Sequence, residues 1–221
     1  MRFSDGPLWV IPGVVVPIAH DRRPIALKML DFITHYHPAQ DPPFRNLSDA
    51  PEDALPAILE GLAARRLSGS KRVFGRRYMP FRRQTEAKLK RLFMEAGGRP
   101  QREAPHYFIL GGSEWFANLY PDTKSVRLPL SALNPATTSF TYPDSAVSMR
   151  LGPDFGLPVD PVRPYHEKVF RLGELEGVLE QFGLPKDEPD EDAYADYHLK
   201  EFERYIEVQV WSDDPVAAWL S

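Results

Sequence analysis

The sequence predicts an α+β fold, with a helix-rich N-terminal half and a mostly antiparallel β-sheet in the C-terminal half. Apolar residues recur with helical spacing in the first hundred positions and alternate in short β-rich runs after residue 105. Segments of the two kinds are grouped along the chain, which favours α+β over an alternating, doubly wound sheet. We expect a single domain over residues 1–221, with a helical region over 20–98 and a sheet region over 105–221.

Helix signals dominate the first half, where one strand is expected within Leu8–Ile18. Proline suits the first turn of a helix, and glycine commonly ends one. An aspartate followed three residues later by a glutamate has the pattern of a capping box. These signals predict three helices: Pro24 to Ile33, a helix opened by Asp49 and Glu52 that buries Leu55, Ile58, Leu59 and Leu62, and Pro80 to Ala96 before Gly97 and Gly98.

Short β-rich runs bounded by turn residues predict the strands of the second half. A Gly-Gly turn follows the first run, with a helix start near Ser113. The apolar stripe of Leu172–Phe182 predicts a helix ended by Gly183, and another helix is expected from Asp192 to Arg204. The predicted strands are Tyr107–Leu110, Val126–Leu130, Phe140–Tyr142, Ala146–Leu151, Lys168–Phe170 and Tyr205–Trp211.

The absence of cysteine excludes several kinds of chemistry. Disulfides, thiolate zinc sites, iron–sulfur clusters and thiol nucleophiles all require it. The N-terminal residues include an early aspartate and no long apolar stretch, so no signal peptide is expected. No apolar run reaches the roughly 20 residues of a membrane helix. We therefore expect a cytoplasmic protein without a membrane partner, and the sequence predicts no oligomeric state.

Charge is distributed unevenly along a chain whose net charge is −4. Residues 65–102 hold thirteen Lys and Arg against two Glu, and residues 174–207 hold twelve Asp and Glu against three Lys and Arg. A basic segment of this kind can bind nucleic acid or an acidic partner. Two solvated helices of opposite charge, packed against each other, would give the same pattern.

The usual catalytic and cofactor motifs are absent from the sequence, including the Walker loop, GxGxxG, GxSxG and HExxH. His35 and His37 would point the same way on a strand, but a metal needs a third ligand and the segment also suits the end of a helix. We expect no metal site. Gly111 and Gly112 either let a ligand approach the backbone or simply form a turn.

The last predicted strand carries the most informative residue of the chain. Its period of two places Ile206, Val208 and Val210 on one face, and Glu207 and Gln209 on the other with two flanking aromatic residues. A carboxylate between aromatic residues can face a cleft and have a shifted pKa. A half-exposed strand with a solvated glutamate is the simpler alternative.

Four segments together resemble a known family. They are PHYFILGGSEWFANLY (105–120), VRLPLSAL (126–133), TTSFTYPDS (137–145) and YIEVQVWSDDPV (205–216). Their order resembles the ADP-ribosyltransferase-like toxins that modify nucleic acids, the DarT-type family. In that family an aromatic strand, a second strand and a Phe-Thr-Asp turn precede a late strand with a catalytic glutamate. The resemblance covers about half of the chain, and the family's early His-Phe-Thr segment has no counterpart.

The resemblance implies an enzyme that uses NAD as co-substrate. Glu207 would be the catalytic residue, because a carboxylate stabilises the positive charge that develops when the nicotinamide–ribose bond breaks. Arg102 or Arg99 would bind the pyrophosphate, and Tyr107 or Tyr142 would stack on the nicotinamide. Gln209, on the face of Glu207, is a further candidate for cofactor binding.

The acceptor implied by the resemblance is a nucleic acid, held by the basic residues 65–102; a protein acceptor is the other option. Two alternatives to this enzyme stay open. The chain could be a non-catalytic binding protein whose basic helix carries Arg76, Arg77, Arg82 and Arg83, or an enzyme or binding protein for another small molecule in an aromatic pocket.

Overall fold

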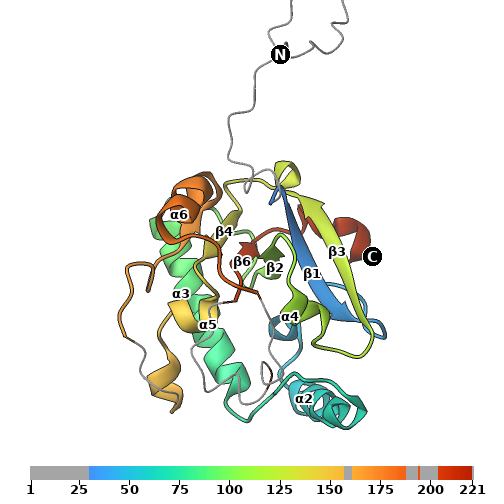
Figure 1. Cartoon of the computed structure of the whole chain (residues 1–221). Helices are drawn as coiled ribbons and strands as arrows, with labels where there is room; N and C mark the ends of the chain where they lie inside the picture. Colours follow the sequence, from blue (N-terminus) through green and yellow to red (C-terminus); the bar gives the residue numbers. More distant parts are fainter. Residues whose placement is uncertain (1–29, 157–160, 188–193, 195–203, 221) are drawn as a thin grey trace, which may run out of the picture.

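Six strands form one antiparallel sheet at the centre of the molecule (Figure 1). Their order across the sheet is β3-β1-β2-β6-β4-β5. The computed structural model describes residues 30–156, 161–187, 194 and 204–220. The sheet and the helices packed on it confirm the predicted α+β class. The strands are β1 (Phe32–Pro38), β2 (His106–Leu110), β3 (Thr123–Pro129), β4 (Thr138–Thr141), β5 (Phe170–Arg171) and β6 (Glu207–Val210).

Two helices contribute to apolar clusters on opposite faces of the sheet. Leu175 of α6 belongs to the cluster that contains Val208, whereas Leu89 and Phe93 of α3 pack with Trp211. The four-residue spacing of Leu89 and Phe93 places both on one side of α3. The described helices are α2 (Leu55–Ala64), α3 (Tyr78–Glu95), α4 (Glu114–Ala117), α5 (Ser145–Ser148) and α6 (Leu175–Phe182), with short 3₁₀ turns such as Leu47–Asp49 and Asp214–Trp219.

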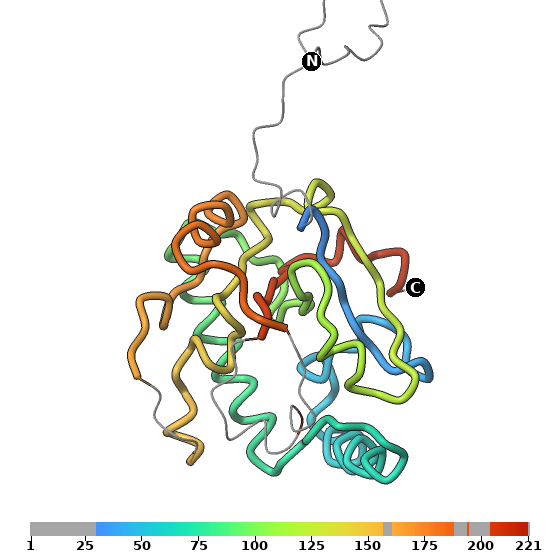
Figure 2. The backbone as a smooth tube through the Cα atoms, in the orientation of Figure 1, coloured from blue at the N-terminus to red at the C-terminus, as the bar shows by residue number. Residues whose placement is uncertain are grey.

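The last strand runs through the middle of the sheet although it comes near the end of the chain (Figure 2). β6 pairs with β2 on one side and with β4 on the other. The expected alternation along β6 is confirmed, because Val208 and Val210 enter the large apolar cluster while Trp211 packs with α3. Glu207 lies opposite Ile109 of β2 and Thr141 of β4, so it occupies the centre of the opposite face.

Strand β1 corrects the expectation of a helix that continues to Ile33. Its residues pair along their whole length with β3, and Ile33 and Thr34 also pair with β2. Both side chains are fully buried. β-branched residues favour a pleated strand, and their position between two partner strands outweighs the helical spacing seen in the sequence.

Helix α5 corrects the expectation of a strand over residues 146–151. The Asp144 carboxylate accepts hydrogen bonds from the N–H groups of Ala146 and Val147, which caps the helix at its N-terminus. This cap precedes an apolar run that the sequence alone assigns to a strand. The aspartate therefore decides the local structure.

The predicted boundary signals of α2 and α3 have different outcomes. α2 begins at Leu55 without a side-chain cap, and Glu52 forms an ion pair with Arg83 in place of the predicted capping box. By contrast, α3 ends as predicted: Gly97 has a φ of +85°, and a Cβ on Gly98 would lie 2.3 Å from the ring of Phe93.

Other predicted segments fall partly or wholly outside the described residues. These are the strand within Leu8–Ile18, the helix from Pro24 as far as residue 29, and most of the helix from Asp192 to Arg204. In the described ranges, no helix is both long enough and apolar enough to cross a membrane.

Candidate active site

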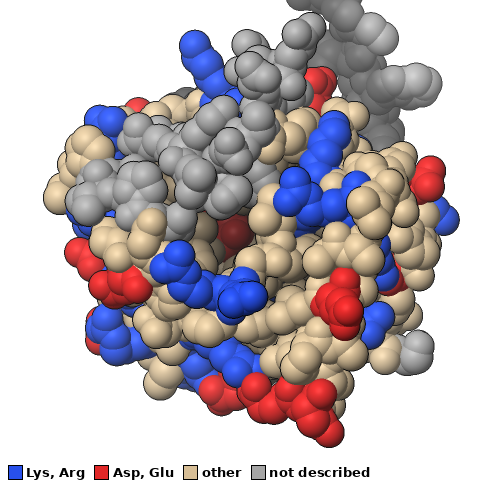
Figure 3. Space-filling view, turned by 90° about the horizontal axis from the view of Figure 1, so that it is seen from below, with Lys and Arg blue, Asp and Glu red and all other residues tan. Residues whose placement is uncertain are grey.

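A cleft of about 1030 Å³ opens beside the centre of the sheet. Its lining includes Tyr107 of β2, Glu207 of β6, and Asp144 and Ser145 at the start of α5. Helix α2 and residues 72–78 contribute further lining. In Figure 3 the surface is hollowed, with acidic atoms at the bottom of the hollow and Lys and Arg side chains around it. The volume is at the upper end of the roughly 300–1,000 Å³ typical of small-molecule sites.

Glu207, at the start of β6, is hydrogen bonded to two side chains. Gln209 Nε2 donates to its Oε1 at 3.1 Å, and the Ser145 hydroxyl supplies a second hydrogen bond. Burial raises the pKa of Glu207, while these two hydrogen bonds and the charges of Arg82 and Arg72 act in the opposite direction. The site thus combines desolvation, which strengthens electrostatic interactions, with donors that support the ionised carboxylate.

A chain of buried hydrogen bonds fixes the amide of Gln209. Trp211 Nε1, which can only donate, bonds Ser139 Oγ at 2.8 Å. Ser139 therefore directs its own proton to Gln209 Oε1, 2.9 Å away. Gln209 Nε2 donates to Thr141 Oγ1 and to Glu207 Oε1, each at 3.1 Å. The sheet in this way presents an oriented donor to the candidate catalytic carboxylate.

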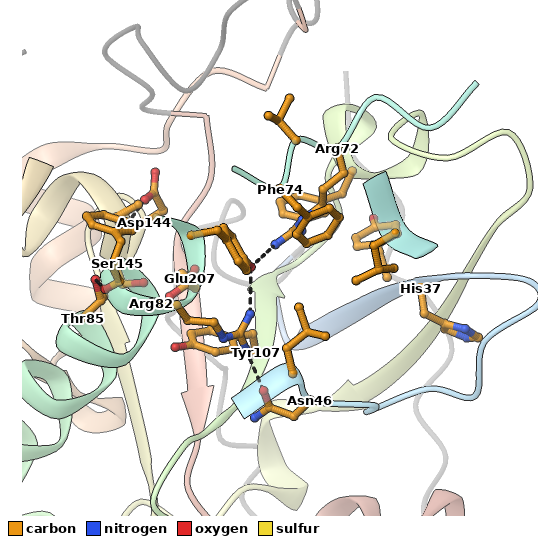
Figure 4. Close-up of a pocket in the computed structure, with 18 of the residues that line it drawn as sticks. His37, Asn46, Arg72, Phe74, Arg82, Thr85, Tyr107, Asp144, Ser145 and Glu207 are labelled. Carbon is orange, nitrogen blue, oxygen red and sulfur yellow. Dashed lines mark hydrogen bonds between the residues drawn. The ribbon is translucent and has the colours of Figure 1, made fainter. Parts of the chain in front are cut away.

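Asp144 places a second carboxyl group in the cleft. Its side chain is buried, at 3% exposure, and its Oδ1 accepts from Ala146 N at 2.7 Å and from Val147 N at 3.0 Å. Burial and the charge of Glu207 raise the pKa of Asp144 to about 7, although the backbone N–H donors lower it in part. Figure 4 shows Asp144, Ser145 and Glu207 together in one part of the cleft.

The Arg82 guanidinium is held by neighbouring side chains within the cleft. Its position on α3 brings it over the ring of Tyr107, 4.9 Å from the ring centroid. Tyr107 in turn donates its hydroxyl proton to Glu86 Oε1 at 3.1 Å. Arg82 itself donates to four acceptors at 2.8–3.0 Å: Ser48 Oγ, Glu86 Oε1, Tyr78 Oη and Asn46 Oδ1.

Tyr78 lies between two arginines. Its hydroxyl oxygen accepts from Arg82 Nη1 at 3.0 Å and from Arg72 Nη2 at 3.2 Å. Burial alone would raise the pKa of Tyr78, but the charges of Arg82 and Arg72 outweigh it and lower the pKa to about 8. The guanidinium groups of Arg72 and Arg82 also act on the carboxylate of Glu207, because their charges lower its pKa in part.

Three further arginines of the cleft are exposed. Arg45, Arg76 and Arg77 line it, and none has a carboxylate within ion-pair distance in the part of the chain that the structure describes. Exposed guanidinium groups of this kind bind phosphate oxygens, often bidentately. These arginines can therefore bind the anionic part of a ligand in the cleft. An electron-poor atom of the same ligand can then lie beside the carboxyl groups of Asp144 and Glu207.

The basic side chains of α3 differ from these three arginines, because carboxylates already pair with most of them. The expected basic helical face is therefore largely neutralised. In the described ranges, the partners come from other parts of the fold or from the next helical turn. The pairs are Arg82–Glu86, Arg83–Glu52, Lys88–Glu167, Lys90–Glu103 and Arg91–Glu95.

The structure brings together Glu207, Tyr107 and Gln209 among the residues predicted for the site. Glu207 and Tyr107 line the cleft. Gln209 is fully buried behind Glu207 and donates a hydrogen bond to it. It therefore positions the carboxylate.

Two other predicted residues lie elsewhere. Arg102 forms ion pairs with Asp49 and Asp213 and is not part of the cleft lining. Tyr142 is buried in the apolar core, where its hydroxyl donates to the Phe182 carbonyl at 3.0 Å. Neither position supports contact with a ligand in the cleft.

The histidines of β1 do not form a metal centre in this arrangement. As expected for a strand, His35 and His37 point the same way, with ring centroids 6.1 Å apart. Burial lowers the pKa of His35 to about 4, and its Nε2 accepts from Phe44 N at 3.1 Å. The described residues contain no group of three or more His, Asp or Glu side chains suited to a metal ion.

The glycine pair after β2 forms a turn outside the cleft. Gly111 has a φ of +67°, and Gly111 N donates to the Phe32 carbonyl at 2.8 Å. The predicted helix start at Ser113 is confirmed, since its hydroxyl caps α4. The Asp187 carboxylate accepts from Glu114 N and Ser113 Oγ, so the chain after α6 contacts the start of α4.

Sequence reasoning missed Asp144 and Ser145 as site residues, and the segment Arg72–Tyr78. An aspartate followed by small residues is an N-cap signal that could have indicated α5. No local pattern indicates that Arg72 and Tyr78 share a cleft with Glu207 at the start of β6, because that depends on the path of the chain. No protein-family model, no curated protein and no solved structure matches this chain.

Proposed function

We propose that this chain is an ADP-ribosyltransferase-like enzyme that consumes NAD and transfers ADP-ribose to a nucleic-acid or protein acceptor. The observation that carries the proposal is the placement of Glu207. Its carboxylate lies in a deep cleft, on a central strand, with Gln209 and Ser145 as hydrogen-bond partners. The resemblance of the segments around β2, β4 and β6 to the DarT-type family supports the same activity.

The geometry suits chemistry in which positive charge develops on a sugar. When the bond between nicotinamide and C1′ of the ribose breaks, the ribose becomes oxocarbenium-like. An oriented carboxylate in a desolvated cleft stabilises this charge far better than water does. The same carboxylate can accept a hydrogen bond from a ribose hydroxyl. Because Gln209 and the sheet fix Glu207, little reorganisation accompanies the reaction.

The exposed arginines of the cleft are the groups that we expect to bind NAD. NAD carries a pyrophosphate, and Arg45, Arg76 and Arg77 have no carboxylate partner among the described residues. They replace Arg102 as the candidates for pyrophosphate binding. Phe74, which lies beside Arg72 in Figure 4, and Tyr107 offer aromatic faces to the rings of the dinucleotide. A cytoplasmic location, where NAD is present, belongs to the same proposal.

The non-catalytic alternative has less support. It requires a basic helical face, but the cations of α3 are engaged by carboxylates. Among the basic residues 65–102 that line the cleft, Arg76 and Arg77 have no carboxylate partner in the described ranges. They would meet an acceptor at the site of reaction, so the acceptor and NAD share one cleft.

Nicotinamide release from NAD tests the proposal directly. The wild type should release nicotinamide, and Glu207→Gln should lower the rate by about 100-fold or more, since it removes the charge that stabilises the transition state. Glu176→Gln, an exposed position on α6, is the matched control and should keep the wild-type rate. Equal rates for wild type and Glu207→Gln, or no release by either, would end the proposal.

A further inference from the structure

The carboxyl group of Asp144 has no role in the bond cleavage described above, yet it is buried in the same cleft as Glu207. No Lys or Arg of the described residues forms an ion pair with it. A buried carboxyl group without a cation is costly to ionise. Its Oδ1 is occupied by two backbone N–H groups, which leaves Oδ2 for a ligand.

We propose that Asp144 is a second catalytic residue, which accepts the proton of the acceptor as the acceptor attacks the ribose. This inference rests on the proposed function. It identifies the acceptor chemically as a group with a proton to lose: a hydroxyl, an amide or amine N–H, or water. The position of Asp144 supports the role, because α5 holds its carboxyl group next to Glu207 while the cap fixes its orientation.

The reaction balances with these two carboxylates alone. The bond between C1′ and the nicotinamide nitrogen breaks, and its electron pair leaves with neutral nicotinamide. The acceptor forms a bond to C1′, and its proton passes to Asp144 and then to solvent. NAD⁺ and the protonated acceptor therefore give the ADP-ribosylated acceptor, nicotinamide and one proton. No oxidant, reductant or metal takes part in this sequence.

The surroundings of Glu207 and Asp144 suit the two carboxyl groups to different roles. Gln209 and Ser145 favour the ionised form of Glu207, whereas burial and the charge of Glu207 raise the pKa of Asp144 to about 7. A proton acceptor works best when its pKa lies near the working pH. Other ionisable groups near α5 and the cleft are Arg72, Tyr78 and Arg82, with Lys88, Arg150, His166 and Glu167 around the end of α5.

Asp144→Asn separates catalysis from structure, because asparagine is also a good N-cap and keeps the oxygen that receives both N–H groups. Asp144→Ser is a second variant that retains a cap and has no carboxyl group. Asp122→Asn, at an exposed position, is the matched control. Thermal unfolding of each variant shows that the fold is kept before any rate is compared.

The test measures two products of NAD between pH 5.5 and 9: ADP-ribose formed with water, and azido-ADP-ribose formed with added azide. In the wild type, the rate with water should rise with pH to a plateau near pH 7 to 8. In Asp144→Asn and Asp144→Ser it should fall by about 100-fold and lose this rise. Azide has no proton to lose, so its reaction should stay within a few-fold of the wild-type rate in both variants.

Three outcomes would overturn the inference. If Asp144→Asn keeps the wild-type rate and pH profile with water, Asp144 accepts no proton while the proposed function stands. If both variants lose the azide and water reactions equally, Asp144 acts on binding or structure. If the wild type forms neither product and releases no nicotinamide, the inference and the proposed function fail together.

Discussion

The two faces of strand β6 give neighbouring residues opposite environments. On one face, Val208 and Val210 lie in an apolar cluster with Phe140 and show at most 1% exposure. On the other face, Glu207 and Gln209 belong to a hydrogen-bonded polar network that borders the cleft. One strand therefore contributes to the stability of the fold through one face and to the candidate site through the other.

This difference explains why the polar network can be buried at all. A desolvated carboxyl group is unfavourable unless donors and partners compensate it. The apolar face supplies the free energy that holds β6 in the centre of the sheet, and β4 supplies the hydroxyl groups of Ser139 and Thr141 to Gln209. We expect substitutions on the apolar face to change stability, and substitutions on the polar face to change activity and its pH dependence.

The largest effect on stability is expected for Phe140→Ala. Phe140 is fully buried and stacks on Phe170, so the truncation should lower the free energy of unfolding by about 3–5 kcal/mol. Urea unfolding measures this loss, and nicotinamide release per folded molecule should remain near the wild-type rate. Leu184→Ala, at a side chain that is 47% exposed, is the control and should change stability by less than about 0.5 kcal/mol.

The comparison would break down if Phe140→Ala lost catalysis in its folded population as strongly as Glu207→Gln does. The two faces would then be coupled, and the carboxylate would depend on packing across the sheet and not mainly on the chain from Trp211 to Gln209.

A smaller effect, with a pH dependence, is expected for Asp144→Asn. The pKa of Asp144 is about 7 in the folded protein against 3.8 as its ordinary value. The folded state therefore binds this proton more tightly, and the wild type loses stability as the pH rises from about 4 to 7. Asp144→Asn lacks this loss, so above pH 7 it should be more stable than the wild type by up to roughly 4 kcal/mol.

Urea unfolding at pH 5, 6, 7 and 8 measures this difference, with Asp122→Asn as the control that should follow the wild type. A difference that stays constant with pH would show that Asp144 titrates alike in the folded and unfolded states. The two carboxyl groups would then not interact as the structure indicates.

Local signals predicted the elements whose residues decide their own conformation. The alternation in β6 and the glycines after α3 are examples, and both were confirmed. The α+β class followed because such signals are grouped along the chain. The prediction failed at β1, where Ile33 and Thr34 gain most from two neighbouring strands, and at α5, where the cap at Asp144 decides against a strand.

The site was predictable only where it lies on one strand. Glu207 and Gln209 share a face of β6, and that alternation is visible in the sequence. Arg102 and Tyr142 were chosen for their residue types, but Asp213 and the Phe182 carbonyl bind them away from the cleft. Asp144 entered the site through contacts between segments more than sixty residues apart in the sequence, which no local pattern encodes.

The most direct test of the account is a crystal structure of the Glu207→Gln variant soaked with NAD, since this variant should bind NAD without cleaving it. We predict that C1′ of the nicotinamide ribose lies between residue 207 and Asp144, with the pyrophosphate at Arg45, Arg76 and Arg77. NAD bound with its nicotinamide end away from residue 207, or an empty cleft at saturating NAD, would contradict the account.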